Sequence, residues 1–133
     1  MNIAKAAVLG AGTMGAGIAA HLANAGIPTL LLDIAPQDGS ITDKNQIVNS
    51  LFDAAKKLKP APFMLGDNAK LITTGNFTDD LAKIKDCDFV IEAVVENLEI
   101  KHKLYAEVEK HRKPGAVIAS NTSGIPIDSI AEP

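Results

Sequence analysis

Short apolar runs alternate with segments of helical periodicity along the whole chain. Each run is nearly continuous in apolar residues, as in a strand buried on both faces, and is too short for a helix. Strands separated by helices in this way are typical of a parallel sheet that is covered on both sides. The pattern predicts an α/β fold with a doubly wound parallel sheet, whose strands lie at residues 5–10, 28–33, 69–76, 89–96 and 116–120.

Helices are expected in the intervals between these strands. The first covers residues 13–25, and Gly26 is expected to cap it in the left-handed conformation. The second follows the candidate N-caps Thr42 and Asp43 and ends in the proline-containing stretch 59–68. Its apolar face is expected to carry Ile47, Leu51, Ala55 and Leu58. Further helices are expected at residues 78–86, at residues 97–113 and after Pro126.

The composition fits one globular domain over residues 1–133, because 47% of the residues are hydrophobic and 22% are charged. The net charge of −3 and the lack of a basic cluster exclude nucleic acid as a natural partner. The single cysteine, Cys87, cannot form an internal disulfide and brings no second sulfur for a metal site. No apolar run is long enough to span a membrane, and a single cysteine fits a reducing compartment, so we expect a cytoplasmic protein. We also expect no bound metal.

Three glycines occupy the first junction between strand and helix, in the sequence GAGTMG. In a dinucleotide-binding turn, Gly10 permits the tight turn, Gly12 lets the backbone approach a pyrophosphate, and Gly15 lets the helix pack on the strand. Thr13 and Met14 lie between them, at a helix start whose free N–H groups favour a phosphate. The motif predicts a dinucleotide site, although by itself it also fits a purely structural corner.

An acidic residue at the end of the second predicted strand supplies the second part of this pattern. Asp33 follows Gly15 by 18 residues, and its carboxylate can accept hydrogen bonds from both hydroxyls of the adenosine ribose. The same charge repels the 2′-phosphate of NADP, and the following Ile34, Ala35 and Pro36 offer no cation. We therefore predict NAD as the cofactor. The alternative is that Asp33 only caps a turn.

Three blocks of sequence together resemble a known family. GAGTMGAGIAAHLANAG, DFVIEAVVENLEIK and IASNTSGIPI, in this order, are similar to the N-terminal NAD-binding domain of L-3-hydroxyacyl-CoA dehydrogenases. The sequence looks most similar to bacterial versions in which the dehydrogenase is fused to an enoyl-CoA hydratase. The resemblance implies oxidation of an L-3-hydroxyacyl-CoA thioester to a 3-ketoacyl-CoA in fatty-acid β-oxidation, with NAD as hydride acceptor.

The resemblance also assigns residues to the site. It implies that Val94, Val95 and Glu96 line the cofactor cleft, with Lys101 near the nicotinamide half. Ser123 matches the serine that touches both nicotinamide and substrate, and it is the one catalytic residue that we assign. Considered without the resemblance, Glu96 is also typical of a helix start, Lys101 of a solvated surface, and the SNTSG segment of an ordinary turn.

The family's catalytic histidine and glutamate are expected beyond Pro133. A sixth strand and a helical C-terminal domain, through which the full-length protein forms a homo-oligomer, are expected there too. We therefore expect residues 1–133 to be a fragment that is inactive by itself. Two other functions stay open, which are a related β-hydroxyacid dehydrogenase and a stand-alone module that senses NAD.

Overall fold

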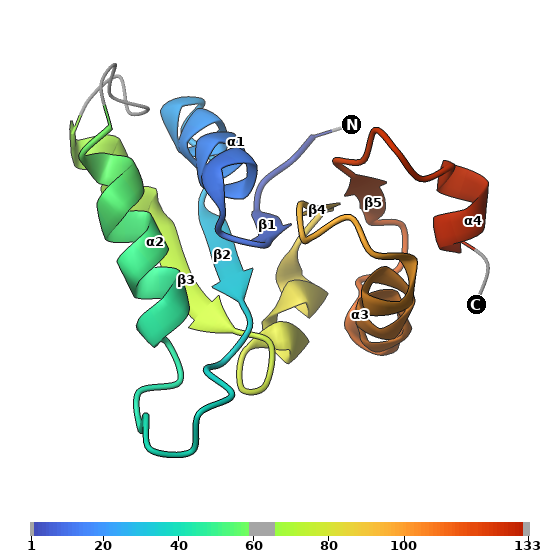
Figure 1. The fold of residues 1–133 in the computed structure, drawn as a ribbon. Coiled ribbons are helices and arrows are strands. Elements are labelled where there is room, and N and C mark those ends of the chain that lie inside the picture. The colour runs from blue at the N-terminus through green and yellow to red at the C-terminus, as the bar shows by residue number, and fades with distance from the viewer. Residues whose placement is uncertain (1, 59–65, 132–133) are drawn as a thin grey trace.

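A five-stranded parallel sheet forms the centre of the molecule (Figure 1). The structure is a computed structural model and describes residues 2–58 and 66–131. The strand order is β3-β2-β1-β4-β5, so the predicted doubly wound parallel sheet is confirmed. The strands are β1 (Ala6–Leu9), β2 (Thr29–Asp33), β3 (Ile72–Asn76), β4 (Phe89–Glu92) and β5 (Val117–Ser120).

Helices cover both faces of the sheet (Figure 1). On one face α1 (Thr13–Asn24) and α2 (Gln46–Lys56) pack on the side chains of Val8 and Leu31. On the other face the 3-10 helix η2 (Leu81–Asp86) and α3 (Leu98–His111) pack on Leu9 and Leu32. Neighbouring strand residues therefore serve opposite cores, which explains why the strands are apolar throughout. The remaining helices are the 3-10 helix η1 (Gly66–Leu71) and α4 (Ile127–Ala131).

Several predicted boundaries change in the structure. β4 ends at Glu92, so residues 93–96, predicted as strand, form a turn instead. α2 begins after Asn45 rather than directly after Asp43, and its buried side is formed by Val48 and Ala55. The predicted apolar face was wrong in part, because Leu51 and Leu58 are exposed. The stretch 59–65, where a helix break was predicted, lies outside the described residues.

The two halves of the sheet diverge between β1 and β4. β1 pairs with β2 on one side and with β4 on the other, although β4 comes much later in the chain. In doubly wound sheets, ligands bind at such a switch point, outside the carboxyl ends of the strands. The turn after β1 and the turn after β4 therefore face the position where a ligand is expected.

None of the helices within residues 2–58 and 66–131 combines the length and the apolar character that crossing a membrane requires.

Candidate functional site

Two of the three glycines at the turn after β1 cannot carry side chains, because backbone atoms lie too close to them. Gly10 has a positive φ of 110°, and a Cβ atom there would lie 2.6 Å from the carbonyl oxygen of Ala93. A Cβ atom on Gly15 would lie 1.7 Å from the carbonyl oxygen of Gly10. Both positions need glycine for the fold itself, since backbone atoms cannot move aside as a side chain can.

Gly12 has no such structural reason to be glycine. Its φ and ψ of −64° and −174° are open to any residue, and a Cβ atom there would meet nothing within 4 Å. It is the N-cap of α1, which has neither a capping side chain nor an acidic residue in its first turn. The first backbone N–H groups of α1 therefore have no side-chain acceptor, and the space beside Gly12 is open, which fits a pyrophosphate at the positive end of the helix dipole.

Asp33 lies at the carboxyl end of β2 and joins this turn. Its Oδ2 accepts a hydrogen bond from the backbone N–H of Ala11 at 2.7 Å, and its Oδ1 accepts one from Ile34 at 2.6 Å. Asp33 therefore does cap the turn, as the alternative interpretation holds. Each oxygen keeps a further lone pair, so the half-buried carboxylate can still accept hydroxyl donors.

Glu92, the last residue of β4, is fully buried and holds together three elements. Its Oε2 accepts hydrogen bonds from the backbone N–H of Val94 and from Lys101 Nζ, both at 2.7 Å. Its Oε1 accepts from Lys101 at 2.8 Å and from the Ser120 hydroxyl at 2.7 Å. Tyr105 adds a longer contact of 3.4 Å to Oε1. This carboxylate joins the ends of β4 and β5 to α3.

Lys101 is as buried as Glu92, with no exposed side-chain surface. The alternative interpretation of Lys101 as a solvated surface lysine is therefore wrong. Its ammonium contacts both oxygens of Glu92 and lies 3.2 Å from Glu96 Oε1. An ammonium group has three N–H donors, so these acceptors can satisfy all of them. Contact of Lys101 with a cofactor stays a prediction.

Glu96 links this cluster to the loop that carries Ser123. Both of its oxygens accept from the Thr122 hydroxyl at 2.8 Å, and Oε2 also accepts from the Gly124 N–H at 3.1 Å. The Thr122 and Gly124 donors, together with Lys101, lower the pKa of Glu96 from 4.5 to about 2. Glu96 therefore stays ionised at every pH at which proteins are usually handled.

The structure brings most of the predicted site residues to one edge of the sheet. Gly10 and Gly12 follow β1, Glu96 follows β4, and the exposed Ser123 follows β5 beside Glu96. Two apolar side chains of the site are exposed, since Met14 is 60% and Val95 is 63% accessible to solvent. Val94 is half-buried against the core below α3. The structure thus assembles these residues, while their functions in binding stay proposals.

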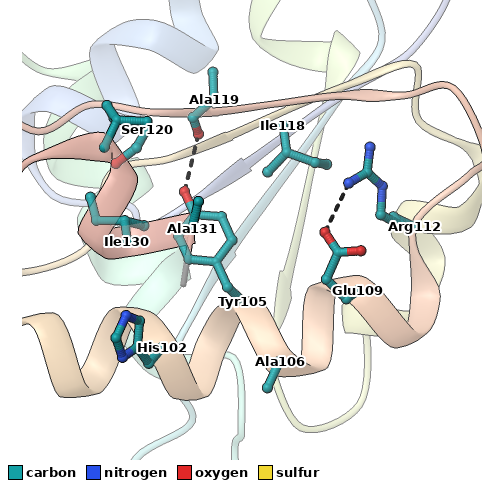
Figure 2. A pocket seen from close by; sticks show the side chains of 11 residues that line it. His102, Tyr105, Ala106, Glu109, Arg112, Ile118, Ala119, Ser120, Ile130 and Ala131 are labelled. Carbon is teal, nitrogen blue, oxygen red and sulfur yellow. Dashed lines mark hydrogen bonds and ion pairs between the residues drawn. The ribbon is translucent and has the colours of Figure 1, made fainter. Parts of the chain in front are cut away.

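A cavity separate from the glycine turn lies along β5, between α3 and α4 (Figure 2). Its volume is about 690 Å³, and Ile118 and Ile130 are among the apolar side chains that line it. The hydroxyl of Tyr105 points toward β5 and donates to the Ala119 carbonyl at 3.4 Å (Figure 2). Burial and the charge of Glu92 raise the pKa of Tyr105 to about 12, so the phenol stays protonated. This cavity does not border the glycine turn.

The sequence interpretation did not single out Glu92, although a signal was present. A glutamate inside the apolar run FVIEAVV must be buried if the run is a central strand. A buried carboxylate needs a cation or several donors. A search for its partner in the next helix would have suggested Lys101, nine residues further on.

Comparison with known proteins identifies close relatives. The family described as "3-hydroxyacyl-CoA dehydrogenase, NAD binding domain" matches residues 5–133. A "Probable 3-hydroxyacyl-CoA dehydrogenase" of Bacillus subtilis (strain 168) is 51% identical over 143 residues, which cover 98% of this chain and 18% of the relative. A "Fatty acid oxidation complex subunit alpha" of Psychrobacter sp. (strain PRwf-1) is 38% identical over 133 residues, with 98% and 18% coverage.

A solved structure of the same kind of enzyme is also similar to this chain. The crystal structure of 3-hydroxybutyryl-CoA dehydrogenase from Escherichia coli K12 superimposes with a TM-score of 0.71 at 32% sequence identity. The match covers 99% of this chain and 27% of that one. The chain therefore spans only a small part of the length of the proteins that it matches.

The buried ion pair between Glu92 and Lys101 generates a stability prediction. Glu92→Gln and Lys101→Met should each lower the free energy of unfolding by about 3–5 kcal/mol, because each leaves an uncompensated charge or unsatisfied donors in the core. The double variant should recover much of that loss, because neither charge is then buried. Urea unfolding of the four proteins measures the coupling. Additive losses in the double variant would contradict the assignment of a direct ion pair.

Proposed function

We propose that this chain, which belongs to the family of NAD-binding domains of 3-hydroxyacyl-CoA dehydrogenases, is the cofactor-binding part of an enzyme that oxidises L-3-hydroxyacyl-CoA to 3-ketoacyl-CoA. The observation that carries the proposal is the bare start of α1 at Gly12, which faces open space without a structural need for glycine. Such a site favours a diphosphate. Its position at the switch point of the sheet supports a dinucleotide.

Each part of the cofactor has candidate partners in the chain. The pyrophosphate would be held by the backbone at Gly12, Thr13 and Met14, and the adenosine ribose by the free lone pairs of Asp33. Val95 and Glu96, which follow β4, would line the nicotinamide side of the cleft. NAD, when bound, supplies the acceptor for the hydride that leaves the substrate carbon.

Ser123 is the proposed substrate contact of this chain. It is exposed and its backbone N–H is 3.4 Å from Glu96 Oε2, so the loop is anchored while the hydroxyl side of the residue is accessible. A serine hydroxyl can orient the substrate oxygen but is by itself too weak a base to remove its proton at neutral pH. The proton must therefore go to another group.

The three histidines of the chain are poorly placed to be that base. His21 is an exposed residue of α1, and His102 and His111 belong to α3. His102 is engaged, because its Nε2 lies 2.6 Å from the Ser129 carbonyl oxygen and must carry the proton of that hydrogen bond. We propose that the family's histidine and glutamate pair, from a segment after residue 133, supplies general-base catalysis.

That segment has a natural place in the fold. Within the described residues β5 pairs only with β4, and all of its residues are half-buried. The cavity beside it is lined largely by apolar groups such as Ile118 and Ile130. We propose that a sixth strand of a longer protein pairs with β5 and covers this cavity, and that a helical domain after it forms the homo-oligomer and binds the acyl-CoA.

The wider setting is part of the same proposal. One relative is named as a subunit of a fatty acid oxidation complex, which supports a place for this enzyme in fatty-acid β-oxidation. Cys87 is buried, and burial raises the pKa of its thiol to about 11, so it is unreactive. A cytoplasmic location and the absence of nucleic-acid partners stay predictions from composition.

Gly12→Val tests the pyrophosphate site. The valine should abolish measurable NADH binding with little loss of stability, because the backbone at Gly12 suits any residue while the added side chain fills the phosphate position. Gly17→Val is a matched control, since Gly17 also has open space around a built Cβ atom but lies further along α1. Calorimetry with NADH measures both variants. Normal NADH affinity in Gly12→Val would show that the turn is only structural.

Asp33→Ala tests the preference for NAD. The variant should bind NADH about 1–3 kcal/mol more weakly, because charge-assisted hydrogen bonds to the ribose are lost. Its discrimination against NADPH should shrink, since the repelling charge is gone. Calorimetric titration of parent and variant with both cofactors gives the four constants. The proposal is contradicted by a parent protein that binds NADPH as tightly as NADH.

The chain of residues 1–133 should bind NADH without oxidising a 3-hydroxyacyl-CoA. The glycine turn, Asp33 and the turn after β4 are all present, whereas the proposed base and most of the acyl-CoA surface are not. An assay of NADH formation with 3-hydroxybutyryl-CoA, run on this chain and on one extended through the helical domain, separates the two. Equal turnover by both would show that the catalytic groups lie within residues 1–133.

A further inference from the structure

The Glu92 carboxylate links the core to the loop that carries Ser123. We propose that Glu92 is a positioning residue, which holds the turn after β4 and, through Lys101 and Glu96, the 122–124 loop in the arrangement that binds the cofactor. The inference rests on the proposed function, because it assumes that this edge of the sheet is the NAD site. Glu92 itself touches no solvent and would touch neither cofactor nor substrate.

The first step is the turn. The backbone N–H of Val94 donates to Glu92 Oε2 at 2.7 Å, so the side chain folds back over the end of its own strand. The N–H of Ala93 donates to the Leu9 carbonyl at 2.7 Å, which ties the same turn to β1. The turn after β4 is therefore fixed at two consecutive residues, next to the contact between Ala93 and Gly10.

The second step runs through Lys101. Both oxygens of Glu92 hold the ammonium within 2.8 Å, and the same ammonium lies 3.2 Å from Glu96 Oε1. Glu96 in turn accepts hydrogen bonds from Thr122 and from the N–H of Gly124. Without the Glu92 carboxylate, Lys101 would be a buried cation with one half-exposed partner, and the loop would lose its side-chain connection to the core.

The third step is the fit between β4 and β5. Glu92 is paired in register with Ser120, and the Ser120 hydroxyl donates to Glu92 Oε1 at 2.7 Å. The next residue, Asn121, donates its N–H to the Glu92 carbonyl at 2.7 Å. The loop thus leaves the sheet from a strand end held by both the backbone and the side chain of Glu92. A buried ion pair by itself adds little to the stability of a fold. The contacts of Glu92 instead fix the positions of the turn after β4 and of the loop after β5.

Glu92→Gln keeps Lys101 and the shape of the site. If this variant is unstable, the double variant Glu92→Gln with Lys101→Met is used for the exchange measurement, because it also removes a predicted cofactor contact. The matched control is Asp88→Asn with Lys113→Met at the other end of β4. There the Asp88 carboxylate likewise accepts from a lysine and from a backbone N–H, that of Ala4 at 2.8 Å. The control removes the same two kinds of group outside the proposed site, and we expect it to cost less stability because this pair is partly exposed.

Two measurements are made on each protein, which are hydrogen exchange of the Gly124 amide without cofactor and the dissociation constant for NADH. In the folded Glu92 variants we expect exchange at Gly124 to be faster and NADH binding to be weaker, each by about tenfold, as when a residue behind a ligand-binding group is lost. The Gly26 amide at the end of α1 serves as a reference. Its exchange rate should change only as far as the global stability of the variant changes. The Asp88 control should keep both values of the parent.

The cofactor-free exchange measurement separates this inference from the proposed function. A parent protein that fails to bind NADH contradicts the proposed function, while Gly124 exchange still reports whether Glu92 holds the loop. Parent-like exchange and parent-like NADH affinity in a folded Glu92 variant would overturn the inference. Equal losses in the Asp88 control would overturn it as well, and so would a double variant that does not fold, because the pair would then serve folding alone.

Discussion

The contact between two backbone turns at the switch point is the constraint on which the rest of this structure depends. The chain at Gly10 and the carbonyl of Ala93 leave no room for a Cβ atom, and Gly15 meets the carbonyl of Gly10 in the same way. These contacts bring the start of α1 against the ends of β1 and β4. In that position the start of α1 lies at the switch point, where ligands bind in doubly wound sheets.

The two sides of this edge treat charge in opposite ways. At the start of α1 the backbone N–H donors have no capping side chain, so a phosphate can accept their hydrogen bonds. Below the turn after β4, the buried charges of Glu92 and Lys101 satisfy one another and the polar groups around them. The first arrangement is suited to binding an anion, and the second is suited to holding neighbouring segments in place.

The edge of the sheet beyond β5 is where we propose that a longer protein continues. β5 has an unpaired edge within the described residues, and an apolar cavity borders it beneath α4. The relatives that the chain matches are several times longer. A strand and a domain added at this edge would lie next to Ser123 and Glu96, where the proposed chemistry occurs.

Much of the fold, and the place of several candidate site residues at strand ends, could be predicted because the signals are local. Apolar runs identify the five strands, and the spacing of the glycines and Asp33 predicts that they stand at the ends of neighbouring strands. The turn at 93–96 and the contacts that Glu92 and Lys101 make could not be obtained in this way, although the place of Glu92 within an apolar run indicates that it is buried. They arise because the register of β4 and β5 places Ser120 beside Glu92, and because α3 brings Lys101 within hydrogen-bond distance of the Glu92 carboxylate. Such contacts join separate elements, so only the tertiary structure decides them.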